Sequence, residues 1–439
     1  MRLGELEPDG AAAVVQARLG RPAQDALEAA VVLEAWAGLP ADAALRLGRR
    51  VRLPADGAAG VRRWRPGDGE GRQGVLAEGV ALLIAIIAVA AWAGPLGDAL
   101  GGDVLEHALK VALPTTLALQ WALRSRYLSR RAGLACLAED RLALVALAVA
   151  VLAGLAAIPR FGPVAAMLVA VWVGGTVLAR RGWGLWYGGL LIVEAVGLEL
   201  GLPALPSLLV LAAVTVVADV VAIATASGVA LAPPGRVSRA LAAGLIGGLL
   251  GVLLIGDPSL GWGVHGAFPA LALVPSVVGS FWGGYHLWTL HESIPRGLLG
   301  VELARASASM PRGPATSIVL GALARLLGAT VVLSLLVGLT ARWTSGTAAA
   351  SLFVAFACAG LVCLFVSLLE SLGYVRWALL CAGAALALEL LVAQLAGSAM
   401  APGTALIAAG TVGTLLAIAP LVGLLRTPGR VLATALWIQ

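Results

Sequence analysis

The sequence predicts an all-α polytopic membrane protein, with twelve transmembrane helices in two six-helix lobes and a small helical cytoplasmic N-terminal extension. Three observations predict this class. Of the 439 residues, 60% are hydrophobic and only 12% are charged, whereas soluble chains are nearer one quarter charged. Apolar runs long enough to span a bilayer recur from residue 75 onward. The cations gather in alternate connections between these runs, as the positive-inside rule requires.

Residues 1–74 form the cytoplasmic extension. The stretch "RPAQDALEAAVVLEAWAGLPADAALRLGRRVRLP" predicts two short helices broken at residues 38–40, because Gly and Pro interrupt the apolar pattern there. Leu27, Val31 and Glu34 do not make a thick apolar face, and a basic linker follows. Two interpretations stay open: a solvated tail resting on the membrane domain, or a docking site for a cytoplasmic glycosyltransferase or assembly protein.

Twelve apolar runs follow the extension, joined by short connections rich in Gly and Pro. A spanning helix needs roughly 20 apolar residues. The first lobe is expected over residues 75–227 and the second over residues 228–439, separated by the segment "GVALAPPGRVSR". The twelve helices are expected to begin near Val75, Val104, Leu142, Val164, Trp183, Ser207, Ala240, Ala267, Ser317, Thr347, Tyr374 and Thr404.

The distribution of cations predicts the topology. With both termini inside, 26 of the 30 Lys and Arg residues fall on the cytoplasmic side, and only Arg160 and Arg342 fall outside. One extra or missing helix would destroy this bias. Asp257 and Ser398 are then expected in outer loops. The net charge of +6 follows from topology and does not indicate nucleic acid. The polar N-terminus has no signal peptide, and the expected location is a bacterial inner membrane.

The motifs of several enzyme classes are missing from the sequence. It contains no phosphate-binding loop of the GxxxxGK[ST] type, no HExxH zinc motif and no D-x-D on a cytoplasmic loop. The outer loops are too short to carry the chemistry of a polysaccharide polymerase. His286 and His291 are five residues apart, so they point away from each other on a helix. We therefore expect no enzymatic activity, no metal and no cofactor.

Ionisable residues inside the predicted spans are the main functional signal. A charge at the bilayer centre costs about 2.5–3.5 kcal/mol on insertion scales, so such groups normally face a bundle interior or a wet cavity. Lys110 is near enough to the outer surface to snorkel. Glu194 and Asp219 either pair with cations on neighbouring helices or have a functional role. Glu389 is a further acid within a predicted span, and Arg325 is too deep to snorkel easily, which favours a cavity role.

Two prolines are candidate hinges. Pro114 kinks the second span, either as a packing feature or as a bend beside a cavity, and Gln120 follows it on a polar path. A similar pattern opens the eighth span, where Pro275 follows a histidine as Pro114 does. This echo between "HALKVALPTT" and "HGAFPALALVPSV" agrees with duplicated six-helix halves, which are common in secondary transporters.

Two segments resemble the multidrug/oligosaccharidyl-lipid/polysaccharide exporter superfamily. "GPLGDALGG" and "ALKVALPTTLALQWALRSRYLSRRAGLACLAED" resemble its first two helices. Arg126 and Tyr127 stand at the position of an Arg-Tyr-like pair that ends the second helix in polysaccharide members of the family. "AFPALALVPSVVGSFWGGYHLWTLHESIPRGLLGVELARA" is similar to the matching helix of the second lobe, particularly in Pel-type polysaccharide transporters. The resemblance implies a flippase or exporter of a polysaccharide or lipid-linked saccharide. The extension of residues 1–74 departs from the family's usual short tail.

We expect cargo binding and ion coupling to rest on separate residues. The expected substrate pathway consists of Lys110, Arg325, Arg124, Arg126 and Gln120. The residues expected to couple transport to H⁺ or Na⁺ are Glu194, Asp219 and Glu389. One alternative is an ion-coupled transporter of a small solute, similar to the major facilitator type, although the loop after the second span lacks that family's Gly-to-Asp-Arg signature. Another is a non-transporting membrane scaffold of a polysaccharide-assembly complex.

Overall fold

The structure is a computed structural model in which not every part of the chain is described. The segments described are residues 8–19, 23, 26–37, 39, 41–51, 84, 88, 92, 95–128, 133–225, 237–257, 347–371, 373–396 and 401–425. Arg325 and Pro275 lie outside them, as do the predicted spans near Ala267 and Ser317 and most of the span near Val75.

The N-terminal extension contains three short helices, α1 (Pro8–Leu19), α2 (Ala26–Ala37) and α3 (Ala41–Gly48). The predicted break between the second and third is confirmed, since α2 ends and α3 begins on either side of residues 38–40. Helix α1 was not predicted. The three helices pack around a small apolar cluster that includes Val15, Leu33 and Val51, so the extension has a core of its own.

Nine of the predicted spans correspond to helices in the described residues. In chain order, the elements from the second predicted span onward are α5 (Gly102–Leu123), the π-helical turn η1 (Arg124–Leu128), α6 (Gly133–Glu139), α7 (Arg141–Ala156), α8 (Gly162–Arg181), α9 (Gly184–Glu199), α10 (Ala204–Ala224), α11 (Val237–Leu253), α15 (Thr347–Ser371), α16 (Val375–Ala396) and α17 (Thr404–Leu425). The described residues contain no strand, so the all-α class is confirmed for them.

Five of these helices are long and apolar enough to cross a membrane, namely α8, α10, α15, α16 and α17. Helices α7 and α11 are also apolar but shorter, with 16 and 17 residues. A chain with this many apolar helices fits a membrane protein, because a 20-residue helix spans the hydrocarbon core of a bilayer. Helix α5 is 22 residues long, but it carries Asp103, Glu106 and Lys110 in its N-terminal half.

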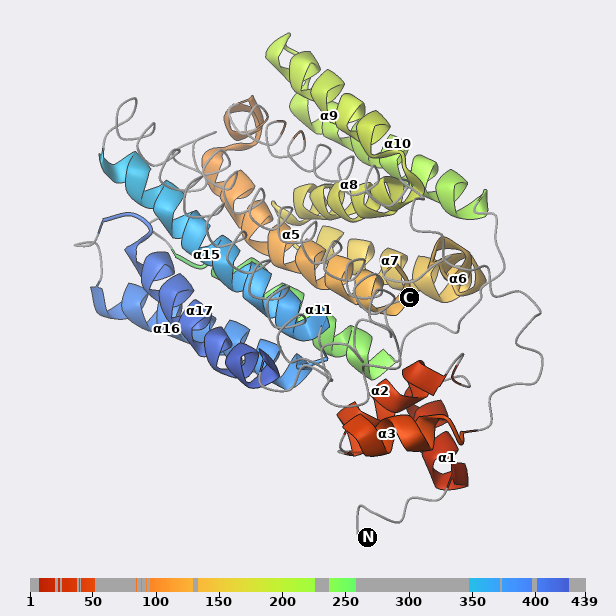
Figure 1. The fold of residues 1–439 in the computed structure, drawn as a ribbon. Coiled ribbons are helices and arrows are strands. Elements are labelled where there is room, and N and C mark those ends of the chain that lie inside the picture. Colours follow the sequence, from red (N-terminus) through yellow and green to blue (C-terminus); the bar gives the residue numbers. More distant parts are fainter. Residues whose placement is uncertain are drawn as a thin grey trace.

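Helices α5 and α11 lie between two groups of helices (Figure 1). On one side, α5 packs against α8, which in turn contacts α7, α9 and α10. On the other side, α11 packs against α16, which forms a three-helix group with α15 and α17. The α5–α11 pair therefore joins helices expected in the first lobe to helices expected in the second.

Glycines of α11 bring its backbone against the backbone of α5. A side-chain carbon at Gly251 would clash with the main chain of Pro114, and one at Gly247 would clash with the Leu117 carbonyl. Gly244 also lies near α5, although less tightly, since a Cβ there would be 3.2 Å from the Ala118 carbonyl oxygen. Small residues spaced three or four apart permit this close approach between membrane helices.

Large apolar side chains cover the outward surfaces of α7, α9 and α10. Helix α7 buries none of its residues, and α9 and α10 expose Val193, Val217 and many other aliphatic side chains. Such a surface would be unusual in a soluble monomer, where large contiguous apolar patches are rare. It is the surface expected of helices that face lipid.

Candidate functional site

The most completely buried acid in the described residues is Glu389 of α16. Its side chain is 0% exposed, and neither carboxyl oxygen has a hydrogen-bond partner within the described segments. The carboxyl group lies over Gly256, where a side-chain carbon would be 3.3 Å from Glu389 Oε2. The next residue, Asp257, is 3% exposed, and its charge and backbone amide both act on Glu389. Two acids are therefore buried together beyond the end of α11.

The burial of Asp257 differs from the sequence prediction, which placed this residue in an accessible outer loop. The sequence favoured an outer loop because Asp257 lies between an apolar run and a proline, which is typical of a turn at the membrane interface. In the structure, the residues that follow α11 are instead buried, with Leu254 and Ile255 covered as well as Asp257. Asp257 is thus a candidate site residue that sequence reasoning missed.

Asp219 lies in a second polar region, between α8 and its neighbours. The glycine pair of α8 makes room for it: a side-chain carbon at Gly174 would clash with the Asp219 carboxyl, and one at Gly175 with the Tyr187 ring. The Tyr187 hydroxyl donates a hydrogen bond to the Val171 carbonyl, at 3.0 Å. Within the described residues, Asp219 Oδ1 is buried without a hydrogen-bond partner. Asp219 of α10 therefore lies against α8, and within the described residues no cation pairs with it.

Glu194 has a different environment from the other two predicted coupling acids. Its carboxyl group accepts a hydrogen bond from the hydroxyl of Ser207, which joins α9 to α10. Both residues are half-buried. Glu194 therefore lies neither with Asp219 nor with Glu389, and the three acids occupy three separate places.

Lys110 forms an ion pair with Glu106 on the preceding turn of α5. The Lys110 Nζ to Glu106 Oε1 distance is 2.6 Å, and the lysine side chain is 38% exposed. The Glu-to-Lys spacing of four residues puts the two on one face of the helix, so the sequence did carry the signal for this pair. The lysine charge is compensated locally, which leaves less of it for a distant anion.

Gln120 and Pro114 both mediate helix packing. The Gln120 side-chain amide donates a hydrogen bond to the Trp172 carbonyl of α8, at 2.8 Å. Pro114 lies against Gly251 of α11, and the next residue, Thr115, bonds back to the Val111 carbonyl of its own helix at 2.8 Å. The packing interpretation of Pro114 agrees with these contacts. Roles for Gln120 in a pathway and for Pro114 in a hinge stay predictions.

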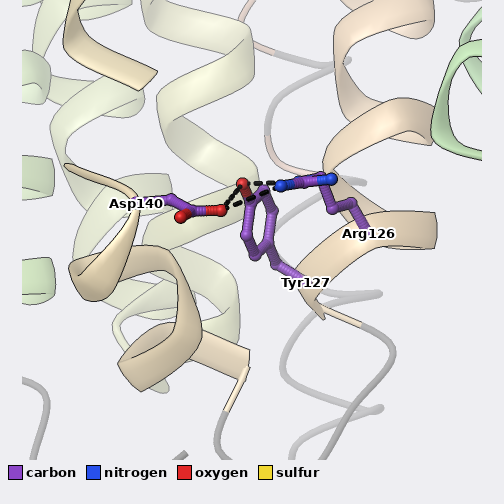
Figure 2. Close-up of polar contacts among 3 residues, drawn as sticks. All are labelled: Arg126, Tyr127 and Asp140. Carbon is purple, nitrogen blue, oxygen red and sulfur yellow. Dashed lines mark hydrogen bonds and ion pairs between the residues drawn. The ribbon is translucent and has the colours of Figure 1, made fainter. Parts of the chain in front are cut away.

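The two arginines predicted at the inner mouth differ from each other. Arg124 is exposed at the start of η1. Arg126 Nε donates to the Tyr127 hydroxyl at 2.7 Å, and its guanidinium contacts Asp140 Oδ2 at 3.0 Å (Figure 2). The Tyr127 hydroxyl in turn donates to the same Asp140 oxygen, at 2.6 Å. The cluster of Arg126, Tyr127 and Asp140 thus joins the end of α5 to the start of α7.

The electrostatics of this cluster follow from its hydrogen bonds. The bond from Tyr127, followed by the one from Arg126, lowers the pKa of Asp140 below its ordinary value of 3.8. Burial and the bond to the Asp140 carboxylate raise the pKa of the Tyr127 hydroxyl. Its bonds to Tyr127 and Asp140 raise the pKa of Arg126. All three groups therefore keep their ordinary protonation states near neutral pH, and the arginine charge is satisfied within the cluster.

Cations at other helix ends make similar connections. Arg181 at the end of α8 donates to the Thr225 carbonyl after α10, at 2.9 Å. Arg239 near the start of α11 lies 3.7 Å from the Glu370 carboxylate near the end of α15. These contacts join helix ends that the predicted topology places on one side of the membrane.

No family model matches the chain, and no curated protein or solved structure matches it either. The resemblance to the exporter superfamily therefore stays a prediction, and the functional argument rests on the residues themselves.

Proposed function

We propose that the protein is a transporter of the bacterial inner membrane, with twelve spanning helices and both termini in the cytoplasm. Its two lobes would be residues 75–227 and 228–439. It would export a polysaccharide or lipid-linked saccharide and would couple export to H⁺ or Na⁺. The support for a multi-span chain is the presence of helices at nine of the twelve predicted positions, five of them long and apolar enough to cross a membrane.

The observation that carries the proposal is the burial of Glu389. An isolated ionised carboxyl group in an apolar interior is costly, so it binds a proton or a cation instead. Here the group is 0% exposed and lies next to a second buried acid, Asp257, whose negative charge increases that cost. Uptake and release of a cation at such a pair is the chemistry that ion-coupled transport requires. A scaffold subunit would have no need of it.

The saccharide cargo rests on the resemblance and on the arginine-rich helix ends. Arg124, Arg180 and Arg239 are exposed at the ends of α5, α8 and α11. Guanidinium groups pair with carboxylates and phosphates through a planar set of donors. An anionic or pyrophosphate-linked saccharide would meet these groups first as it approached from the cytoplasmic side.

The test compares export in strains that differ only in this protein. Cells lacking the gene would be complemented with the wild type, with Glu389→Gln, or with Glu199→Gln as a matched control at an exposed position of α9. Surface polysaccharide and folded protein would be measured in the same membranes. We expect Glu389→Gln to fold normally, because it removes a buried charge, yet to lose most export. Glu199→Gln should keep it.

Two results would contradict different parts of the proposal. Unchanged surface polysaccharide in cells lacking the gene would exclude the saccharide cargo and favour a small solute. Full export by Glu389→Gln would exclude coupling at this acid while leaving the cargo intact.

A further inference from the structure

The contact between α5 and α11 differs in kind from the contact between α5 and α8. Against α11, backbone meets backbone: Gly251 lies on the main chain of Pro114, and Gly247 on the Leu117 carbonyl. Closely packed surfaces of this kind do not slide continuously, because any shift produces overlap. This contact crosses the boundary between the two predicted lobes.

Against α8, no glycine brings the backbones together. The glycines of α8 face other elements: Gly162 lies on Leu155, Gly174 on Asp219 of α10 and Gly175 on Tyr187 of α9. Apart from apolar packing, helix α5 is connected to this side by side-chain contacts. They include the Gln120–Trp172 hydrogen bond and, nearer the N-terminal end of α5, the His107–Phe161 ring contact, with centroids 5.6 Å apart.

The cluster of Arg126, Tyr127 and Asp140 provides a further connection at the other end of α5. Two of its three hydrogen bonds run from η1 to Asp140, the residue that precedes α7, and the third joins Arg126 to Tyr127 within η1. The turn η1 is π-helical, and single π turns often mark functional positions in a helix. Water can replace polar contacts at a helix end more readily than it can enter a glycine-lined backbone contact.

We propose that α5 and α11 move as one rigid pair, and that the Gln120–Trp172 bond and the Arg126–Tyr127–Asp140 cluster are releasable links holding this pair to α7 and α8. The pair would belong mechanically to neither lobe alone. The opening surface would then lie between α5 and α8, with α11 carried along. This deepens the transport proposal, because it names where the lobes would separate, but it can be tested without any substrate.

The test measures two distances from one shared position on η1. In a variant without the four native cysteines, nitroxide labels would be placed at Arg124→Cys with Ser238→Cys, and at Arg124→Cys with Arg180→Cys; all three positions are exposed. The first distance spans α5 and α11, and the second spans α5 and α8. Electron-spin distance measurements on the full chain in nanodiscs would compare these pairs before and after the links are removed.

We expect Gln120→Ala combined with Asp140→Ala to lengthen the Arg124–Arg180 distance by several ångströms and to leave the Arg124–Ser238 distance unchanged. Gln120→Ala with Tyr127→Phe is a milder second variant that keeps the aromatic ring in its apolar cluster. Thr115→Ala is the matched control, since the Thr115 hydroxyl donates to the Val111 carbonyl within α5 itself, and both distances should stay as in the wild type.

A disulfide gives a second, independent measurement. A Cβ at Gly248 would lie 3.6 Å from Ala118 Cβ, within the range that a disulfide needs, so Ala118→Cys with Gly248→Cys should cross-link α5 to α11. With this bond closed, removal of the links should still lengthen the Arg124–Arg180 distance. The proposal is overturned if the disulfide blocks that change, if the Arg124–Ser238 distance changes with it, or if neither distance responds. None of these outcomes depends on whether the protein exports a saccharide.

Discussion

Helices α7 and α11 are nearly equal in length and both are apolar, yet they lie in opposite surroundings. Helix α11 buries eight of its 17 residues against α5 and α16, whereas α7 buries none of its 16. Their glycines differ in the same sense. A Cβ added at Gly244, Gly247 or Gly251 of α11 would meet atoms of α5 within 4 Å, whereas a Cβ added at Gly154 of α7 would meet none.

The difference teaches that hydrophobicity alone does not separate interior from lipid-facing helices. Lipid tails are as apolar as leucine, so burying a leucine against protein gains little over leaving it in lipid. What selects α11 for the interior is a surface of small residues that lets another backbone approach. Helix α7 contains one glycine, Gly154, and its attachments include Leu152 and Leu155 and, at its start, Asp140.

The largest expected effect concerns truncation of equivalent leucines in the two helices. Leu250 of α11 is 1% exposed and Leu147 of α7 is 51% exposed. Leu250→Ala should leave a cavity and lower the free energy of unfolding by about 2–5 kcal/mol. Leu147→Ala should change it little, because lipid fills the space. Thermal unfolding of both purified variants in the same detergent would check this, and equal losses would mean that α7 is also packed against protein.

A smaller effect is expected when a methyl group is added to the glycines. Gly251→Ala should clash with the Pro114 backbone and cost about 1–3 kcal/mol through overpacking. Two alanine substitutions provide matched controls. Gly248→Ala meets only Ala118 Cβ at 3.6 Å, and Gly154→Ala meets open space. In the same unfolding measurement, Gly251→Ala should be the least stable of the three variants. Equal stability of all three would contradict the close contact between α5 and α11.

The smallest effect concerns the polar attachment of α7. The pKa of Asp140 is lowered in the folded state by Tyr127 and then Arg126. The ionised Asp140 therefore stabilises the fold at pH values above about 3.8, its ordinary pKa. This contribution is lost as the pH falls through the lowered pKa of the folded state. The pair is partly exposed, so we expect about 1 kcal/mol or less. Asp140→Asn should lower the unfolding temperature at pH 7, and this gap should close at strongly acidic pH. A gap independent of pH would exclude the charge as its cause.

Much of the helical architecture could be predicted from the sequence, because the length of an apolar run translates directly into a spanning helix. Nine predicted spans appear as helices for this reason. Helix α1 was missed, since "PDGAAAVVQARL" is short and alanine-rich and has no strong apolar periodicity. The pairing of Lys110 with Glu106 was open to prediction, because it depends only on spacing along one helix.

The candidate site was harder to predict, because its contacts depend on tertiary structure. The sequence singled out Glu389 and Asp219 as acids in apolar runs, and both lie inside the helix groups. It could not bring Asp257 to Glu389, since these residues lie far apart in the chain, one after α11 and the other in α16. It could not join Arg126 to Asp140 either, because that contact depends on the π-helical turn and on the path of the following connection.

The 16-residue length of α7 has a consequence for the membrane around it. At 1.5 Å per residue the helix is about 24 Å long, whereas the hydrocarbon core of a bilayer is about 30 Å thick. On the twelve-span proposal, α7 crosses the membrane with none of its residues buried, so the lipids beside it would absorb much of this hydrophobic mismatch, for example by thinning locally. A thinned leaflet brings the headgroup region nearer to the bilayer midplane along one edge of the protein. On the twelve-span proposal, the acyl chains of a lipid-linked cargo would meet a thinned part of the membrane there.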